Sequence, residues 1–275
     1  MTEQDAWCSV AAGWERRRPL FSAATAQLTR RMVELAAPRP GESVLELAAG
    51  PGDTGFAAAE LIGDSGRLLS TDFAPEMVET ARRLAADRDL RNVEFAVVDA
   101  TAIPLPDAGV DLVLCRFGLM LIPDMAGVAA EIARVLRPGG RAVLAVWAEP
   151  ERNPWIGVLG TVARTHGWLE PPEPDAPGPF RLSDPARFRA VVESGRLHVE
   201  SLEEVPVEWH ASSRDEWWET VLDMSPTAGA LAAELGQVRF DELRILSEQA
   251  IDRFVQADGS VRMPGVAHVL LATAG

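Results

Sequence analysis

Short apolar runs alternate with helix-like patterns along the first half of the chain. Apolar runs bounded by glycine, proline or aspartate are typical of buried strands, whereas apolar residues that recur every three or four positions are typical of helices. Strands and helices that alternate in this way form a mostly parallel sheet with right-handed crossovers and helices on both faces. The pattern predicts strands at 43–48, 67–72, 93–99, 110–116 and 141–147, and helices at 20–37, 54–62, 75–87 and 126–136.

The alternation stops after Trp147. Residues 149–184 are rich in proline, which indicates an ordered excursion or a flexible loop. Together the elements predict a Rossmann-like, doubly wound α/β sheet with a helical cap over the carboxyl edge of its strands. Beyond the proline-rich segment the pattern predicts a helix at 186–194, a strand at 197–209 with a bend at Pro206, helical structure over 212–256 and a last strand at 266–274.

Composition and charge narrow the classes of function. The chain of 275 residues has a net charge of −15, whereas a nucleic-acid partner requires a basic surface. No apolar stretch approaches the roughly 20 residues of a membrane span, and the first residues lack a signal-peptide pattern. Cys8 and Cys115 lie far apart with no C-x-x-C motif, so we expect no disulfide, no metal site and a cytoplasmic protein.

The segment 44–55, VLELAAGPGDTG, carries the most informative motif. Gly50, Gly52 and Gly55 fit the G-x-G-x-x-G turn that joins a strand to a helix and lets a nucleotide approach the backbone. Asp72 ends the next predicted strand, where a carboxylate can bind the two hydroxyls of a ribose. The same aspartate can also be a helix N-cap, because a helix is predicted just after it.

Two acidic side chains flank this turn. Glu46 lies in the preceding strand, and Asp53 follows Gly52 at the start of the next helix. A phosphate binds best to an uncharged turn at the positive end of a helix, so these carboxylates would repel a pyrophosphate. They suit a nucleoside that carries positive charge, and we expect Glu46 to face its cationic amino-acid end.

Further candidates stand at the ends of the second and third predicted strands, where open α/β sheets bind ligands. Asp99 can accept a hydrogen bond from an adenine amino group while the Ala100 N–H donates to a ring nitrogen. Phe73 and Met77 offer apolar contact to a base. Each has a plainer interpretation, because the two apolar residues can belong to the core and Asp99 can cap the short turn at 100–103.

In these segments the chain resembles the class I S-adenosylmethionine-dependent methyltransferases, in particular the ubiquinone/menaquinone-biosynthesis-like (methyltransferase type 11) branch. The resemblance covers about residues 40–148 and rests on VLELAAGPGDTG, STDFAPEMVETAR, VVDATAIPLPDAGVDLVLCRFGLMLIPD and EIARVLRPGGRAVLAVW. It implies a seven-stranded sheet with an antiparallel last strand, and S-adenosylmethionine as cofactor. By this resemblance Glu46, Gly50 and Gly52 surround the methionine part of the cofactor, Asp72 holds the ribose, Asp99 and Ala100 contact adenine, and Arg116 closes the site at the fourth strand.

The chain departs from the family pattern in three places. Ala48, a further cofactor candidate, stands where a first glycine is usual, which this branch tolerates. The histidine often found after the fourth strand is absent, and the segment GLMLIPD (118–124) offers Met120 instead. The Asn/Asp-Pro-Pro-Tyr/Phe motif is also missing, and Asn153–Pro154–Trp155 follows the fifth strand, where we interpret it as a turn.

The sequence motifs leave the catalytic residues unknown. A sulfonium is itself a strong methyl donor, so the main task of the protein is alignment in a dry site, and a general base is optional. The weak candidates for a base are His166, His210 and Glu149. His198 and His268 lie in strand-like runs and are better explained by structural roles.

The eight tryptophans bear on the methyl acceptor. Tryptophan outside a sheet core often lines an apolar pocket and presents a polar N–H. Trp217–Trp218 can equally join the cap to the sheet. The residues that we assign to a substrate pocket are Trp7, Trp14, Met120, Trp147 and Trp155.

We therefore expect a methyltransferase that acts on a small, apolar or aromatic metabolite, for example in secondary metabolism. We expect it to use no metal and to bind neither nucleic acid nor a membrane. A homodimer is possible. The alternatives are a protein that binds S-adenosylmethionine without transferring methyl, as a regulator or in steering a cyclisation, and an NAD-dependent oxidoreductase. We expect an N-terminal helical lid (1–38), a cofactor-binding core (39–150), and a third region (151–275) that completes the sheet and carries the substrate cap (about 212–256).

Overall fold

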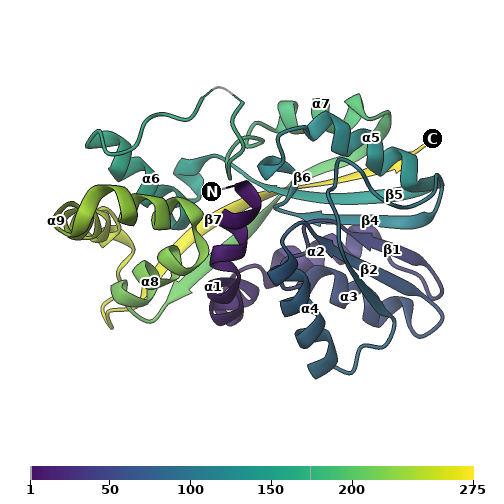
Figure 1. Cartoon of the computed structure of the whole chain (residues 1–275), viewed down its shortest axis with the longest axis horizontal. Helices are drawn as coiled ribbons and strands as arrows, with labels where there is room; N and C mark the ends of the chain where they lie inside the picture. The colour runs from purple at the N-terminus through teal and green to yellow at the C-terminus, as the bar shows by residue number, and fades with distance from the viewer. Residues whose placement is uncertain (1, 174) are drawn as a thin grey trace.

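The computed structural model, which describes residues 2–173 and 175–275, is built on one seven-stranded sheet (Figure 1). Its strands are β1 (Ser43–Glu46), β2 (Arg67–Asp72), β3 (Val93–Val97), β4 (Val110–Arg116), β5 (Leu136–Trp147), β6 (Leu197–Ala211) and β7 (Val261–Ala274). Their order across the sheet is β3-β2-β1-β4-β5-β7-β6. β1 to β5 pair in parallel, whereas β7 is antiparallel to both β5 and β6. The predicted sheet, with its antiparallel last strand, is confirmed.

Helices cover both faces of the sheet. Figure 1 shows α2, α3 and α4 on one face and α5 and α7 on the other, while α6, α8 and α9 gather around the far part of β6 and β7. No helix in the two described ranges combines the length and apolar character needed to cross a membrane. The helices are α1 (Glu3–Ala24), α2 (Ala26–Ala36), α3 (Asp53–Ile62), α4 (Pro75–Asp87), α5 (Met125–Val135), α6 (Pro154–Thr165), α7 (Pro185–Ser194), α8 (Arg214–Met224) and α9 (Pro226–Ala250), with short 3-10 turns η1 (Leu119–Leu121), η2 (Pro150–Arg152) and η3 (Asp252–Phe254).

Local sequence explains the elements around the strand ends. α4 begins at Pro75, whose fixed φ suits the first turn of a helix, and buries Met77, Ala81 and Ala85 at helical spacing. Residues 112–115 of β4 are buried without alternation, because helices cover both faces of a parallel strand. The strand order reverses around β1, whose neighbours are β2 and β4. A ligand edge is therefore expected where these three strands end.

In the second half of the chain the structure corrects the prediction for 149–184 and confirms helical structure within 212–256. Residues 149–184 are not only a loop, because α6 forms within them. Asn153–Pro154–Trp155 is accordingly the start of a helix rather than a turn, and the buried Asn153 side chain donates to the Ala148 and Val266 carbonyls. The helical region 212–256 divides into α8 and α9, because Ser225 caps the second helix by accepting the N–H of Ala228.

A second correction concerns residues 20–37, which form two helices instead of one. The chain breaks at Thr25, which is buried and lies outside helical geometry (φ −97°, ψ 10°). The Thr25 hydroxyl donates to the Phe21 carbonyl at 2.8 Å and accepts from the Arg116 guanidinium at 2.9 Å. The break therefore follows from a tertiary contact that the local pattern does not encode.

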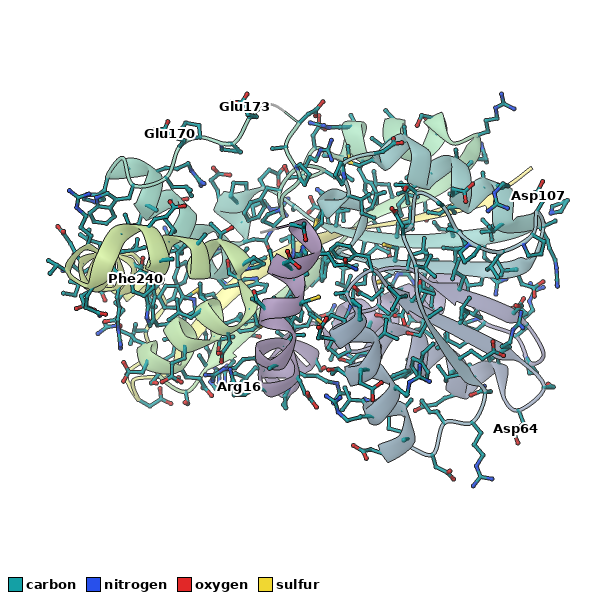
Figure 2. All side chains as sticks on the ribbon, in the orientation of Figure 1. Arg16, Asp64, Asp107, Glu170, Glu173 and Phe240 are labelled. Atoms are coloured by element: carbon teal, nitrogen blue, oxygen red, sulfur yellow. The ribbon has the colours of Figure 1, made fainter. Side chains whose placement is uncertain are left out.

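α1 lies at the carboxyl edge of the parallel strands. Asp64 and Asp107 precede β2 and β4 and mark the amino edge; Figure 2 shows both on the side of the molecule remote from α1. Near the start of α1, the Gln4 side chain donates to the carbonyl of Phe73, directly after β2, at 2.6 Å. The N-terminal helix therefore covers the edge at which a ligand is expected.

α1 also joins this edge to the helices around β6 and β7. The Trp14 indole donates to the Met224 carbonyl at 3.1 Å, and Arg16 pairs with Asp223 of α8 at 2.6 Å. Figure 2 shows Arg16 near the end of α1 that meets α8. A Cβ at Gly13 would lie 1.9 Å from the Asp223 carbonyl oxygen, so the two helices touch through their backbones.

This close contact predicts that Gly13→Ala destabilises the protein. The added methyl group must push α1 away from α8, and we expect the free energy of unfolding to fall by about 1–3 kcal/mol. Gly229→Ala is the matched control: it lies in α9 with no heavy atom within 4 Å of an added Cβ, and alanine raises helix stability by up to about 1 kcal/mol. Urea unfolding measures the stability of both variants and of the native protein. A Gly13→Ala variant as stable as the native protein would contradict the close packing of α1 on α8.

Candidate functional site

The backbone of the turn between β1 and α3 is accessible at Gly50. Gly50 (φ 53°) and Gly52 (φ 86°) adopt the left-handed geometry that favours glycine. An added Cβ at Gly52 would lie 2.5 Å from the Phe56 ring, whereas at Gly50 no heavy atom lies within 4 Å. Ala48 keeps a left-handed φ of 49° without glycine, at a cost of about 1 kcal/mol. A ligand can therefore approach the main chain at Gly50.

The side chain of Glu46 stabilises this turn through hydrogen bonds. Its side chain is buried and accepts the Gly55 N–H at 2.7 Å and the Ser70 hydroxyl at 3.1 Å. Burial raises the pKa of Glu46 to about 7, against the opposing effects of the Gly55 hydrogen bond and of Arg116. Each carboxylate oxygen is thus engaged by the protein, and the expected contact with a cationic ligand stays a prediction.

Asp72 ties the turn to the end of β2. Its buried carboxylate accepts the Gly50 N–H at 2.9 Å and the Ala74 N–H at 3.0 Å. Burial is the largest influence on the Asp72 carboxyl and raises its pKa. The N-cap of α4 is Ala74, so the N-cap interpretation of Asp72 is wrong. Each oxygen retains a lone pair for a further donor.

The third strand contributes a less buried carboxylate. β3 ends at Val97, so Asp99 and Ala100 lie in the turn that follows. Asp99 Oδ1 accepts both the N–H and the hydroxyl of Thr101, at 2.8 and 2.7 Å. Asp99 therefore does cap this turn, and its exposed side chain keeps a second oxygen that can face a ligand.

A small apolar cluster lies under α1 beside Asp72. Met77 and Ala74 of the α4 start are buried against Ala11, with Phe73, Trp7, Cys8 and Trp14 packed around them. Met77 and Phe73 thus belong to a second, smaller core cluster, and their contact with an adenine stays a prediction. They lie where α1 covers the strand ends.

Asp53, at the start of α3, is paired with α1. Arg18 contacts one carboxylate oxygen at 2.5 Å, and the Ser22 hydroxyl donates to the other at 2.5 Å. Arg88 approaches the same group at 3.3 Å. An acidic residue at a helix N-terminus is favoured by the helix dipole, and here it also anchors α1 beside the glycine turn.

Arg116 ends β4 on the other side of β1. Its guanidinium donates from Nη1 to the hydroxyls of Thr25 and Thr29, both at 2.9 Å, and lies 5.3 Å from the centre of the Phe21 ring. Burial lowers the pKa of this arginine, while Asp53 and Glu46 act in the opposite direction. Arg116 thus lies where α1 and α2 meet the sheet.

An aromatic cluster lies at the ends of β4 and β5, formed by Phe21, Phe117, Trp147, Trp155 and Trp209. Phe117 stacks on Trp147 with ring centres 3.7 Å apart, and Trp155 stacks on Trp209 at 4.3 Å. Trp147 and Trp155 meet edge to face at 5.4 Å. Phe21 of α1 stands between the two stacks, within 6.5 Å of Phe117, Trp155 and Trp209.

The structure brings the predicted pocket residues together only in part. Trp147 and Trp155 belong to the aromatic cluster, and Trp14 reaches it through Phe21, at 4.9 Å. Trp7 lies further out, 6.4 Å from Trp14, and Met120 is buried in the main core.

Sequence reasoning missed Phe21 and Trp209 as members of the aromatic cluster. Trp209 has a local signal, because alternate residues of β6 are buried. Trp217 and Trp218 of α8 lie 6.2 Å apart, and Trp218 lies 5.6 Å from Phe240 of α9, which fits their packing role.

Of the three weak candidates for a base, His166 and His210 are exposed, whereas Glu149 follows Trp147 of the aromatic cluster by two residues. His166 is exposed at the end of α6 and stacks on Trp168. His210 is exposed on β6, on the face opposite the buried Trp209. Glu149 lies 3.7 Å from Arg152.

The raised pKa of Glu46 predicts a pH-dependent effect of Glu46→Gln. Between pH 4.5 and about pH 7 the folded protein keeps a proton that the unfolded chain has lost, so the contribution of Glu46 to stability falls as the pH rises. Glutamine stays neutral throughout. We expect the stability of the variant relative to the native protein to rise by about 2 kcal/mol between pH 5 and pH 8.

Urea unfolding across this pH range measures the difference. Glu94→Gln, at an exposed position of β3, reports the general effect of removing one negative charge. A stability difference between Glu46→Gln and the native protein that does not change with pH would contradict the raised pKa of Glu46.

Comparison with known proteins identifies the family. A family model described as a methyltransferase domain matches residues 44–140, from β1 into β5. The chain is 30% identical over 192 residues to the ubiquinone/menaquinone biosynthesis C-methyltransferase UbiE of Azotobacter vinelandii, which covers 69% of this chain and 73% of that protein. It is 33% identical over 147 residues to UbiE of Teredinibacter turnerae, covering 53% and 59% of the two chains. It is 39% identical over 112 residues to the aklanonic acid methyltransferase DauC of Streptomyces sp. strain C5, covering 41% and 51%.

The matches to the Teredinibacter and Streptomyces proteins thus span only 59% and 51% of those relatives.

Solved structures share the fold. The [4+2]-cyclase SpnF matches with a TM-score of 0.59 at 16% identity, covering 98% of this chain and 96% of that one. A SAM-dependent methyltransferase from Aquifex aeolicus matches with a TM-score of 0.52 at 20% identity, covering 67% and 87%. The chain therefore belongs to the class I S-adenosylmethionine-dependent methyltransferases, whose cofactor is S-adenosylmethionine.

Proposed function

We propose that the protein transfers a methyl group from S-adenosylmethionine to a small, apolar or aromatic metabolite. One observation carries this proposal: the open glycine turn and Asp72 share one edge of the sheet with the aromatic cluster. The turn can receive a nucleoside, and the buried rings of the cluster make the interior at the same edge apolar. The relatives named for ubiquinone/menaquinone biosynthesis and for aklanonic acid support a small-molecule acceptor.

The residues at this edge fit the cofactor. Asp72 accepts one backbone N–H at each oxygen, which leaves lone pairs for the two hydroxyls of a ribose. Asp99 and Ala100 would contact the adenine, and Phe73 and Met77 would pack against it. The open backbone at Gly50 lets the sulfur end approach the main chain.

The proposed reaction requires little acid–base catalysis by the protein. When bound, the cofactor supplies a methyl group on a positively charged sulfur. The aromatic cluster would orient the acceptor and exclude water, and α1 would cover both ligands as a lid. Within this proposal residues 1–38 form the lid, residues 39–150 bind the cofactor, and the segment 212–256 within 151–275 caps the acceptor.

A second candidate is a protein that binds S-adenosylmethionine without transferring its methyl group. The exposure of His166 and His210 favours it, because Glu149, two residues after Trp147, is then the one of the three candidate bases left near the aromatic cluster for an acceptor that must lose a proton. The likeness to a cyclase is one of fold and adds no argument about activity. Transfer of labelled methyl to any acceptor would exclude this candidate. A nicotinamide cofactor is not proposed, since the family uses S-adenosylmethionine.

The proposal predicts that the protein binds S-adenosylhomocysteine and that Asp72 contributes strongly to binding. We expect Asp72→Ala to weaken binding about ten- to hundredfold, because hydrogen bonds from the ribose to a buried carboxylate are lost. Asp72→Asn retains an acceptor and should weaken it less. Isothermal calorimetry measures both, with labelled methyl transfer to a pool of aromatic metabolites as the activity assay.

Asp107→Ala is the control for this experiment. Asp107 lies at the amino edge of β4 (Figure 2), and its removal should change the affinity by less than about twofold. A native protein that binds NAD and not S-adenosylhomocysteine would overturn the proposed function.

A further inference from the structure

A cleft beside the junction of α1 and α2 lies outside the residues assigned above to the cofactor and the acceptor. Its volume is about 420 Å³, and it lies between the end of α1, the start of α2 and the strands β6 and β7. This volume falls within the range of about 300–1,000 Å³ that is typical of small-molecule sites. His210 is the one earlier candidate among the described residues that line it.

The apolar residues of the cleft are small. They are Leu20, Ala23 and Ala24 at the end of α1, Ala26 at the start of α2, and Pro206 of β6. Leu20 and Ala26 are half-buried, and Ala23 and Pro206 are exposed. An apolar body in the cleft would therefore remove apolar surface from water.

The charged residues of the cleft carry more positive than negative charge. Arg30 of α2 and Arg262 of β7 line it together with one acid, Glu208 of β6. Arg30 has no ion-pair partner among residues 2–173 and 175–275. Arg262 lies 3.6 Å from Glu208, and both side chains are exposed, so this pair contributes little. Both arginines are therefore available to an anion.

His210 adds a further hydrogen-bond donor next to Arg262. The two residues are directly opposite each other in the register of β6 and β7, so their side chains lie on the same face of the sheet. An imidazole N–H and a guanidinium can donate to one acid group. In a chain with a net charge of −15, a local excess of positive charge attracts anions to this cleft.

A smaller cleft of about 270 Å³ continues from the first and shares Arg30 and Pro206 with it. Its own arginine, Arg31, pairs with Glu34 at 3.1 Å and with Glu203 at 2.5 Å. The positive charge of Arg31 is thus balanced by these acids. The unbalanced positive charge is therefore concentrated in the larger cleft.

We propose that the larger cleft is a second ligand site, which binds a small amphiphilic anion. The acid group of this ligand binds Arg30 and Arg262, and its apolar body covers the small side chains at the end of α1. The ligand class is an organic acid with a single acid group on a ring or a short chain. The inference goes beyond the proposed function, since it depends on neither the cofactor nor methyl transfer.

Two probes test the role of the acid group. 2-Naphthoate and 2-naphthamide share the flat ring system, and only the first is an anion. The full-length protein, labelled with ¹⁵N and saturated with S-adenosylhomocysteine, is titrated with each probe while NMR follows the backbone amides. We expect 2-naphthoate to shift the amides of 20–30, 207–210 and Arg262, and to bind about fivefold or more tightly than 2-naphthamide.

Three variants change the charge of the cleft. Arg30→Gln and Arg262→Gln should each weaken 2-naphthoate about two- to fivefold, and about tenfold together, without changing the affinity for 2-naphthamide. Glu208→Gln removes the acid that competes for Arg262, so it should strengthen 2-naphthoate about two- to fivefold. All three side chains are exposed, so we expect the variants to fold.

Arg67→Gln is the matched control. Like Arg262, Arg67 is an exposed arginine of a strand with a long ion pair, 3.9 Å from Glu94, but it begins β2 at the amino edge of the sheet. Its replacement should change neither probe affinity.

Three results would overturn the inference: 2-naphthoate shifts no amide of the cleft, 2-naphthamide binds as tightly, or Arg67→Gln weakens 2-naphthoate as much as Arg262→Gln does. A protein that does not bind S-adenosylhomocysteine would contradict the proposed function alone. The same titrations without S-adenosylhomocysteine would then test the cleft.

Discussion

Two buried carboxyl groups hold the glycine turn through hydrogen bonds from its backbone. Glu46 ends β1 and accepts the Gly55 N–H at 2.7 Å; Asp72 ends β2 and accepts the Gly50 N–H at 2.9 Å. Burial raises the pKa of both groups, so each carboxyl lies where the loss of a hydrogen-bond partner is most unfavourable. The turn is therefore fixed by the core of the sheet, while the open side of Gly50 stays available to a ligand.

α1 connects this turn to the remainder of the molecule. Arg18 pairs with Asp53 beside the turn, Arg16 pairs with Asp223 of α8, and Phe21 stands between the two aromatic stacks. Because one helix makes all these contacts, the cofactor edge and the aromatic cluster share a single cover. The break at Thr25 gives that cover a defined end, held by Arg116.

The sequence predicts the sheet well because the spacing of apolar residues and the position of glycine turns can be recognised within short segments. The bounds predicted for β2, β4 and α4 match the structure, and the predicted glycine turn and Asp72 do meet. What depends on distant contacts was not predictable. The break at Thr25 follows from a bond to Arg116, and Phe21 and Trp209 meet across the fold. α6 was missed because prolines surround its start, although proline at a first helical position is favourable.

Hydrogen–deuterium exchange with and without S-adenosylhomocysteine tests the central claim, that the cofactor binds at the ends of β1, β2 and β3. We expect slower exchange in the glycine turn (47–56), at the start of α4 (72–77) and in the turn at 99–101, with no change in α9. Protection confined to α9 or to the amino edge of the sheet, or binding without protection of the glycine turn, would contradict it.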